Sequence, residues 1–324
     1  MVPHGLAVWV GMLCANVAIA QFGPNFKQRF EIVAPGNPGG GIDLMARALE
    51  STLREGKWVS QPMIIKNMSG AAGDIAKTYV HQHPGDASYL YIESNRIYLN
   101  KIVGTTKIGI EDVTPIARLA TDYLVWIVRA DSPYRNARDI LDKLKADPTA
   151  VVFGLGATPS NDQMHILRPA LSVGIDPHKM RIASFKSGGN LMIQLLGGHV
   201  AVISTSVSEA IEQIRAGQVR VLAVSARERL TGEMAQAPTW RSMGVDITIL
   251  HWRGLFAPLG LAPEVVKFWD DTLGRMVKTD AWKKTLARYD WYDAYADSAT
   301  FRTVLEQERT LNAQIIVNNL GRVK

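Results

Sequence analysis

Short apolar runs alternate along the chain with loops of small residues and with amphipathic segments. The first unit has an apolar run at residues 30–34, a glycine-rich loop, and then Met45, Leu49 and Leu53 at i, i+4 and i+8 before Gly56. The spacing predicts a helix with one apolar face, ended by glycine. A strand, a loop and a helix in this order are typical of a parallel sheet, so we predict an α/β fold.

The same unit recurs after residue 56. Further strands are predicted at residues 63–65, 89–92, 151–153, 182–183, 200–203 and 219–224, with small-residue loops at 67–73, 154–161, 184–189 and 204–206. Most of these loops open a predicted helix, and residues 263–318 are predicted to be helical throughout. Because ligands bind at the carboxyl edge of open α/β sheets, we expect the loops to form the binding site.

Two longer apolar segments, residues 116–129 and 247–258, do not fit this unit. We interpret them as strands that cross between two lobes. Lobe 1 would comprise residues 27–124 and 254–324, and lobe 2 residues 125–253. Two crossing strands form a hinge, at which a few residues absorb the change in backbone dihedral angles when the lobes close. The ligand is therefore expected in the cleft between the lobes.

The apolar stretch at residues 6–20 is about 15 residues long, which is shorter than the roughly 20 needed to span a bilayer. Ala18 and Ala20 fit a signal-peptidase site, so we predict a signal peptide at residues 1–20, cleaved after about Ala20, and export to the periplasm. Residues 1–5 contain no Lys or Arg, unlike an ordinary signal, and a misassigned start codon is one explanation for this difference. A lipoprotein signal at Cys14 is disfavoured by the bulky Leu13 before it.

The amino-acid composition excludes several classes of site and partner. Cys14 is the only cysteine and lies in the predicted signal, so a mature chain has no disulfide, thiolate metal site or cysteine nucleophile. The net charge is +6, but Lys and Arg are scattered, so no nucleic-acid partner is predicted and small anions are favoured. His81 and His83 stand two apart at a predicted helix end, and no His-Glu-x-x-His occurs, so neither a metal site nor a cofactor is predicted.

The glycine run Pro38, Gly39, Gly40, Gly41 is the strongest candidate for a ligand site. Glycine lets the backbone approach a ligand closely, and the first N–H groups of the next helix are free to donate to an anion. A phosphate site of the P-loop type requires a lysine after the last glycine, and here Asp43 would repel phosphate. We interpret Asp43 mainly as a helix-start residue that pairs with Arg47 at i, i+4.

Enzyme signatures are incomplete. Pro159 occupies the place of the third glycine in a dinucleotide fingerprint at residues 154–159, and Ser187 lacks the glycine of a hydrolase elbow, since Phe185 precedes it by two positions. No catalytic residue is therefore predicted. The further ligand candidates are hydroxyl, amide or small residues in loops after strands, which can cap helices or contact ligand oxygens: Ser69, Gly70, Ala71, Ala72, Gly73, Ser94, Asn95, Thr158, Ser160, Asn161, Ser204 and Thr205.

The chain also resembles a known family over nearly the whole predicted mature chain. The matching motifs, in order, are Pro38-Gly39-Gly40-Gly41-x-Asp43-x-x-Ala46-Arg47, Asn67-x-Ser69-Gly70-Ala71-Ala72-Gly73, Gly188-Gly189 with Leu195-Leu196-Gly197-Gly198-His199-Val200, Ala216-Gly217-Gln218-Val219-Arg220-Val221-Leu222-Ala223-Val224, Ala237-Pro238-Thr239-Trp240, and Trp252-Arg253-Gly254. In these motifs the chain resembles the Bug family, the periplasmic solute-binding proteins of tripartite tricarboxylate transporters.

The resemblance implies a type II periplasmic binding protein fold, in which two α/β lobes close on the ligand as a Venus flytrap, without catalysis. It implies a small carboxylated ligand held by the loops at residues 38–41 and 69–73, with residues 158–161 and 204–206 closing from the second lobe. It also implies membrane transporter subunits as partners, and we expect a monomer. At Ala201, many relatives have an aspartate.

Two questions stay open at this stage. A binding protein that docks on a membrane signalling partner would have the same fold, so the sequence does not separate sensing from transport. For the ligand contacts, we expect backbone N–H donors and hydroxyls to supply the affinity, rather than a buried arginine.

Overall fold

The computed structural model describes residue 26 and residues 29–156, 158–185 and 188–320. The predicted signal peptide, its cleavage site after Ala20, and Cys14 lie outside these residues. Within them, none of the helices combines the length and the apolar character that crossing a membrane requires.

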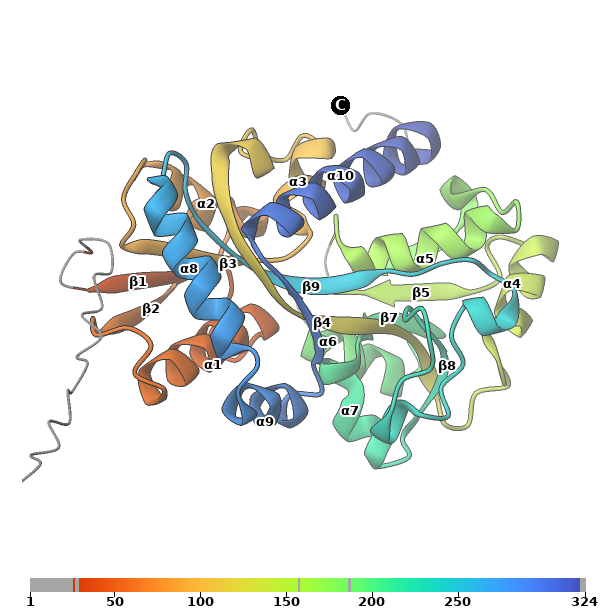
Figure 1. Cartoon of the computed structure of the whole chain (residues 1–324). Coiled ribbons are helices and arrows are strands. Elements are labelled where there is room, and N and C mark those ends of the chain that lie inside the picture. Colours follow the sequence, from red (N-terminus) through yellow and green to blue (C-terminus); the bar gives the residue numbers. More distant parts are fainter. Residues whose placement is uncertain (1–25, 27–28, 157, 186–187, 321–324) are drawn as a thin grey trace, which may run out of the picture.

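The first part of the chain forms one α/β lobe (Figure 1). Its strand β1 lies between β2 and β3 and is parallel to both. The elements are β1 (Phe30–Ala34), α1 (Gly41–Glu55), β2 (Met63–Asn67), the 3₁₀ turn η1 (Ala71–Gly73), α2 (Asp74–His81), β3 (Tyr89–Glu93), α3 (Arg96–Ile102) and the 3₁₀ turn η2 (Ile110–Asp112). The predicted order of strand, small-residue loop and helix is confirmed for the first two units.

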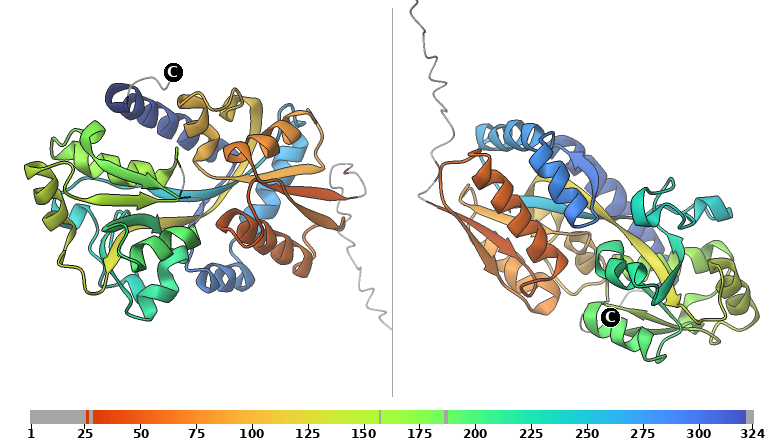
Figure 2. Two further views of the ribbon diagram at one scale, coloured as in Figure 1. Left: turned by 180° about the vertical axis from the view of Figure 1, so that it is seen from behind. Right: turned by 90° about the horizontal axis from the view of Figure 1, so that it is seen from below.

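The middle of the chain forms a second lobe, which the views of Figure 2 separate clearly from the first. Here β5 lies between β6 and β7 and is parallel to both. The chain enters this lobe through β4 (Val113–Arg129), and the following elements are α4 (Ala137–Ala146), β5 (Val152–Leu155), α5 (Asn161–Ser172), η3 (Pro177–Lys179), β6 (Arg181–Ser184), α6 (Gly188–Leu196), β7 (Val202–Ser206), α7 (Val207–Arg215), β8 (Val219–Val224), η4 (Gly232–Met234) and η5 (Arg241–Met243).

Two strands join the lobes, as predicted from the long apolar segments. β4 pairs antiparallel with β9 (Leu250–Pro258) from Val113 to Tyr123, and from Leu124 onward it pairs with β7 and β8. One mixed sheet therefore runs in the order β2-β1-β3-β9-β4-β7-β5-β6. The prediction of a parallel sheet is wrong for the middle of this order, because the crossing strands run against their neighbours.

Two predicted boundaries are also wrong. Residues 204–206 were expected in a loop, but they end β7, because they pair with β4 at residues 124–126. The stretch predicted to be helical at 263–318 forms α8 (Pro263–Met276), α9 (Asp280–Arg288) and α10 (Ser298–Leu320). A strand, β10 (Tyr292–Ala296), lies between α9 and α10. β10 pairs antiparallel with β4, so hydrogen bonding to a distant strand overrides the local helical pattern.

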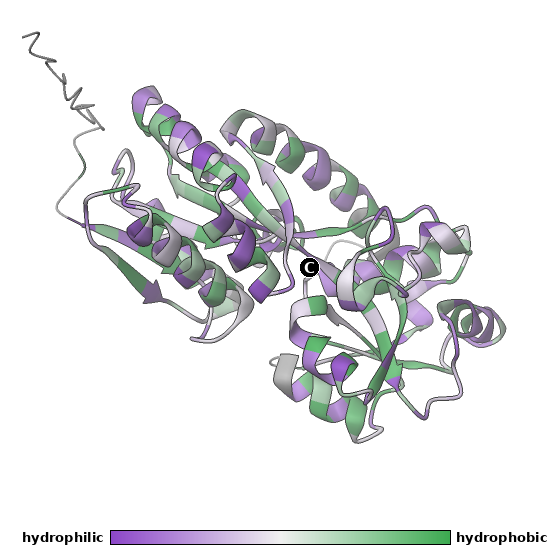
Figure 3. Cartoon of the chain, turned by 60° about the horizontal axis from the view of Figure 1, so that its bottom comes forward, coloured by the Kyte–Doolittle hydropathy of each residue, from purple (hydrophilic) through white to green (hydrophobic). Residues whose placement is uncertain are grey.

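Apolar side chains fill the interior of both lobes. The strands in the middle of each lobe are mainly hydrophobic in Figure 3, and hydrophilic residues gather on the outer helices. The tryptophans Trp126, Trp240, Trp252, Trp269 and Trp282 are fully buried. Burial of each such ring removes a large apolar area from water, so the tryptophans stabilise the lobes rather than offer an exposed stacking surface.

The two crossings are tied together where β4 changes partners. The Ser225 hydroxyl accepts a hydrogen bond from the Leu124 backbone N–H over 2.9 Å and donates to the Ile249 carbonyl over 2.7 Å. One side chain thus links both connections between the lobes and fixes their spacing.

Candidate ligand-binding cleft

A cleft of about 370 Å³ opens between the lobes, at the carboxyl ends of their parallel strands. Nine of the predicted ligand residues line it: Gly40, Gly41, Ser69, Gly70, Gly73, Ser94, Asn95, Ser160 and Asn161. They come from the loops after β1, β2 and β3 and from the start of α5. The structure therefore brings together loops that lie more than 100 residues apart in the sequence.

Other predicted residues lie outside the described lining: Pro38, Gly39, Ala71, Thr158, Ser204 and Thr205. The Ala72 side chain is not among those described. The Ser204 hydroxyl is fully buried and bonds to the ring of His165 over 3.0 Å, and Thr205 donates to Glu209 over 2.9 Å. Both side chains thus serve contacts within lobe 2.

The first glycine loop is held in place by Asp43. Its carboxylate accepts hydrogen bonds from the Gly39 backbone N–H (2.8 Å), the Arg47 guanidinium (2.8 Å) and the Asn67 amide (2.9 Å). Burial alone would raise the pKa of Asp43, but these hydrogen bonds outweigh it and lower the pKa. The expected pair with Arg47 is confirmed, and Asp43 is a charged acceptor that fixes the loop.

Helix α1 begins directly behind this loop. Its N-cap residue is Gly40, which offers no side-chain acceptor for the first N–H groups of the helix. These groups include those of Gly41 and Ile42, which line the cleft. Free N–H groups at a helix start attract negative charge, so this wall of the cleft suits an anion.

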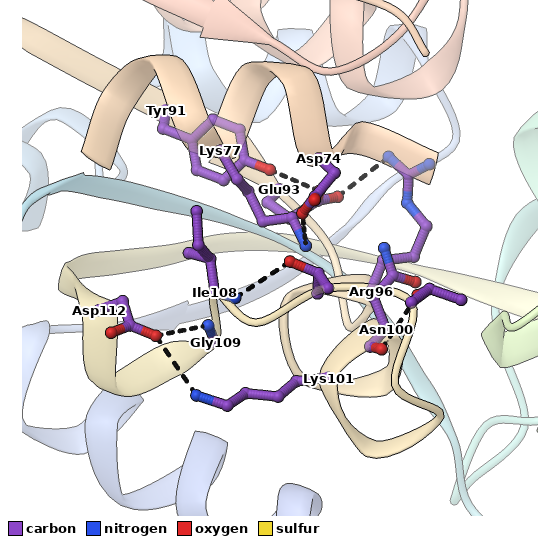
Figure 4. Close-up of polar contacts among 12 residues, drawn as sticks. Asp74, Lys77, Tyr91, Glu93, Arg96, Asn100, Lys101, Ile108, Gly109 and Asp112 are labelled. Atoms are coloured by element: carbon purple, nitrogen blue, oxygen red, sulfur yellow. Dashed lines mark hydrogen bonds and ion pairs between the residues drawn. The ribbon is translucent and has the colours of Figure 1, made fainter. Parts of the chain in front are cut away.

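A buried charged cluster lies behind the loop after β1 and the second loop, residues 69–73 after β2 (Figure 4). Arg96 donates to the Glu93 carboxylate over 3.1 Å and to the Pro35 carbonyl over 3.3 Å. Glu93 also accepts from the Tyr91 hydroxyl over 2.6 Å. Since Pro35 and Arg96 line the cleft, this cluster joins the loop after β1 to the start of α3.

Lys77 completes this cluster from α2. Its ammonium is fully buried and lies 3.3 Å from an Asp74 carboxylate oxygen (Figure 4). Burial lowers the pKa of Lys77, while the charges of Glu93 and Asp74 oppose that shift. Gly73 borders the same cluster at φ +92°, and a Cβ there would stand 3.2 Å from Glu93 Oε2. The loop is thus packed against fixed charges.

Arg253 is the main cleft residue that the sequence prediction missed, and its presence there runs against the expectation that a buried arginine takes no part in ligand binding. It lies in β9, lines the cleft, and is only 5% exposed. Its Nε has no hydrogen-bond partner among the described residues, and its NH1 reaches only the His251 and Trp252 carbonyls, both at 3.4 Å. A buried cation with an unused donor suits a ligand anion. The signal was present, since Arg253 is charged within an apolar crossing strand.

Arg253 also faces acidic groups. Burial lowers its pKa, and the charges of Asp122 and Glu209 oppose this. Asp122 is fully buried in β4 and accepts a hydrogen bond from the Ser208 hydroxyl. Burial raises the pKa of Asp122 to about 6, although Arg253 and Ser208 act against that rise.

Asn95 connects the cleft to the C-terminal helix. Its amide donates to the Tyr98 hydroxyl (2.8 Å) and to Glu308 Oε2 (2.9 Å), and Glu308 also accepts from Trp252 Nε1 (2.8 Å). Because the carboxylate fixes which end of the amide is the donor, Asn95 Oδ1 is left as a free acceptor, without a partner among the described residues. Helix α10 thereby positions a polar group in the cleft.

The wall formed by lobe 2 carries hydroxyls, an amide and two carboxylates: Ser160, Asn161, Asp162, Ser206 and Glu209. Ser160 caps α5 by accepting from the Gln163 N–H over 3.2 Å, so its hydroxyl proton remains available. The Asn161 amide donates to the Leu250 carbonyl over 3.1 Å. The two carboxylates lie in the first turns of α5 and α7, and no sequence motif had marked them.

His165 is not among the residues that line the cleft. Trp240 Nε1 donates to His165 Nε2 over 2.7 Å, so the ring proton lies on Nδ1, next to the Ser204 hydroxyl. The ring is fully buried, and burial lowers its pKa to about 3, helped by the charge of Arg168. A neutral His165 therefore joins α5 to β7 and to Trp240.

Comparison with known proteins agrees with this geometry. The chain is 26% identical to protein BugT of Bordetella pertussis over 241 residues, which is 73% of this chain and 72% of that protein. A TctC solute-binding protein from Polaromonas, solved without ligand, is 26% identical with a TM-score of 0.74, and the match covers 90% of this chain and 98% of that one.

A Rhodopseudomonas palustris protein solved with adipate has a TM-score of 0.78 at 21% identity, over 89% of this chain and 96% of its own. These solved structures confirm the two-lobed periplasmic binding fold with its interlobe cleft. The family model described as tripartite tricarboxylate transporter family receptor matches residues 45–321. The chain belongs to this family of transporter receptors.

Proposed function

We propose that this protein is an exported receptor that binds a small carboxylated metabolite in the interlobe cleft. It would deliver that ligand to the membrane subunits of a tripartite tricarboxylate transporter, act as a monomer, and catalyse no reaction. The family supports the receptor role. The observation that carries the ligand class is Arg253, a buried cation with an unused donor in the cleft.

The donors in the cleft suit a carboxylate. The ligand carboxylate would lie against the first N–H groups of α1, with Ser69 and Gly70 on the second loop and Arg253 behind it. Charged hydrogen bonds of this kind contribute more than neutral ones. The solved relative with adipate supports a small carboxylate as the ligand class for this chain as well.

Closure would move the second lobe toward these loops. We propose that lobe 1 comprises residues 27–124 and 254–324 and lobe 2 residues 125–253, since β4 changes partners between Tyr123 and Leu124. Ser225 would remain the fixed point, because it bonds to both crossings. Export is proposed from the signal-like segment at residues 1–20, with cleavage after about Ala20 into the periplasm.

The ligand class is tested by thermal unfolding of the purified mature chain with mono-, di- and tricarboxylates and aromatic acids. A ligand that binds the folded state raises the melting temperature as its concentration passes the dissociation constant. We expect a rise with at least one carboxylate. A flat response to all the acids, with a rise for a nucleotide or a sugar, would refute the proposal.

A further inference from the structure

The charges in the cleft are unevenly divided between its two walls. The cations Arg96 and Arg253 stand with the glycine loops, on α3 and β9, whereas Asp162 and Glu209 stand on the opposite wall, on α5 and α7. Within the described residues, no ion pair within 4 Å joins either of these two carboxylates to a cation. The glycine-loop side also carries the Asp43 carboxylate, but that charge is paired with Arg47, so the unpaired carboxylates lie on the lobe 2 side of the cleft.

Acidic residues in a first helical turn are common, because they stabilise the helix dipole, so these carboxylates alone assign no ligand. The independent observation comes from buried groups without partners. Arg253 Nε is a donor and Asn95 Oδ1 an acceptor, both residues are at most 5% exposed, and both line the same cleft. A ligand that satisfies both groups must offer an acceptor and also a donor.

We propose that the cleft selects an aminocarboxylate, with its carboxylate against the glycine loops and Arg253 and its primary ammonium facing Asp162 and Glu209. This inference rests on the proposed function and narrows its substrate class. The proposed ligand carries its two charged groups at the two ends of a short carbon chain, because the groups address different elements of the cleft lining. Such a ligand is zwitterionic and matches the charge of both walls.

Electrostatics disfavours the alternative of a second carboxylate at the lobe 2 wall. Burial and the charge of Glu209 already raise the pKa of Asp162 well above its usual value, and Arg253 only partly offsets this. Another negative charge would add to that repulsion, whereas an ammonium would relieve it. A dicarboxylate of the same length is therefore the natural competitor for the test.

The test is calorimetric titration of the mature chain at pH 7.5 and low salt with ligands matched in length. The pairs are 4-aminobutanoate with succinate, 5-aminopentanoate with glutarate, and 6-aminohexanoate with adipate, and butanoate, pentanoate and hexanoate serve as the uncharged-end references. At one length, we expect the aminocarboxylate to bind at least about tenfold more tightly than its dicarboxylate and monocarboxylate partners.

Two nearly isosteric variants locate the effect. Asp162→Asn and Glu209→Gln should each weaken aminocarboxylate binding by about tenfold, and neither should weaken monocarboxylate binding, because each removes a negative charge near Arg253. Glu212→Gln is the matched control, because Glu212 lies on the same helix and pairs with Arg215 at the surface. It should bind all ligands like the wild type.

The outcomes separate this inference from the proposed function. If a dicarboxylate or monocarboxylate binds as tightly as the aminocarboxylate, or if both variants bind the aminocarboxylate like the wild type, the inference is wrong and the carboxylate receptor stands. If none of the carboxylates in these pairs or in the wider acid panel binds, the proposed function fails as well.

Discussion

Asn67 donates a hydrogen bond from its side-chain amide to Asp43 Oδ1 over 2.9 Å. Asn67 ends β2 and Asp43 stands in the first turn of α1, so this bond joins the loops that follow the first two strands. The same carboxylate holds the Gly39 N–H. The shape of the wall that we propose to bind the ligand carboxylate therefore depends on one buried aspartate.

Replacement of this aspartate should loosen both loops. Asp43→Ala removes the acceptor for Gly39, Arg47 and Asn67, and we expect the free energy of unfolding to fall by about 2–3 kcal/mol. Arg47→Ala is the control, since the Arg47 side chain is half exposed and its loss leaves the other two bonds intact. Urea unfolding of both variants measures the difference, and an equal loss in both would contradict this role.

Asp43 should also contribute to acid sensitivity. Its pKa is lowered in the folded state, so its stabilising effect is present above the unfolded pKa and is lost as the pH falls through the folded pKa. The wild type should therefore lose stability on acidification in that range. Asp43→Asn should show a flatter dependence there in urea unfolding at several pH values, and parallel curves would count against the assignment.

A side chain at Gly73, in the loop after β2, should lower the stability of the protein. This residue has φ +92°, and a Cβ would lie 3.2 Å from Glu93 Oε2 and 3.3 Å from Pro35 Cβ. We expect Gly73→Ala to lower the free energy of unfolding by about 1–2 kcal/mol, because L residues are strained at positive φ. Gly36→Ala is the matched control, since it also lies at the cleft but meets no atom within 4 Å. Similar melting temperatures for the two variants would show that the loop can yield.

The buried His165 gives a second pH dependence with a defined window. Its folded pKa is about 3 and the ordinary value is 6.5, so the unfolded chain binds more protons between these values. The stability from neutral His165 is complete above about pH 6.5 and falls by about 1.4 kcal/mol per pH unit as the pH drops toward 3. His165→Gln should be less stable at pH 7 but should lose less between pH 6 and 4. If the variant keeps the wild-type slope, the histidine is not responsible.

Much of this architecture could be predicted from the sequence, because its signals are local. The glycine loop at residues 38–41 and the strand before it lie where the apolar pattern placed them. The crossing strands were predictable as well, since β4 and β9 are long and apolar. A short stretch of sequence does not show which distant strand a segment pairs with. The strand β10 and the antiparallel direction of the crossing strands were therefore missed.

The candidate site was predicted only in part for a similar reason. Ser69, Asn95 and Ser160 were predicted because they lie in loops that follow strands, and such loops meet at one edge of the sheet. All three line the cleft. Arg253 comes from the middle of a crossing strand, and Asp162 and Glu209 come from helices. Their meeting in the cleft depends on how the two lobes pack, which no local pattern encodes.

The central claim is that a carboxylate binds in this cleft against Arg253. The most direct measurement is calorimetric titration of the most effective acid from the thermal panel into the wild type, Arg253→Gln and Arg47→Gln. We expect saturable binding by the wild type, affinity at least about tenfold weaker in Arg253→Gln, and no change in Arg47→Gln. Unchanged affinity in Arg253→Gln, or no saturable binding of any acid by the wild type, would contradict the account.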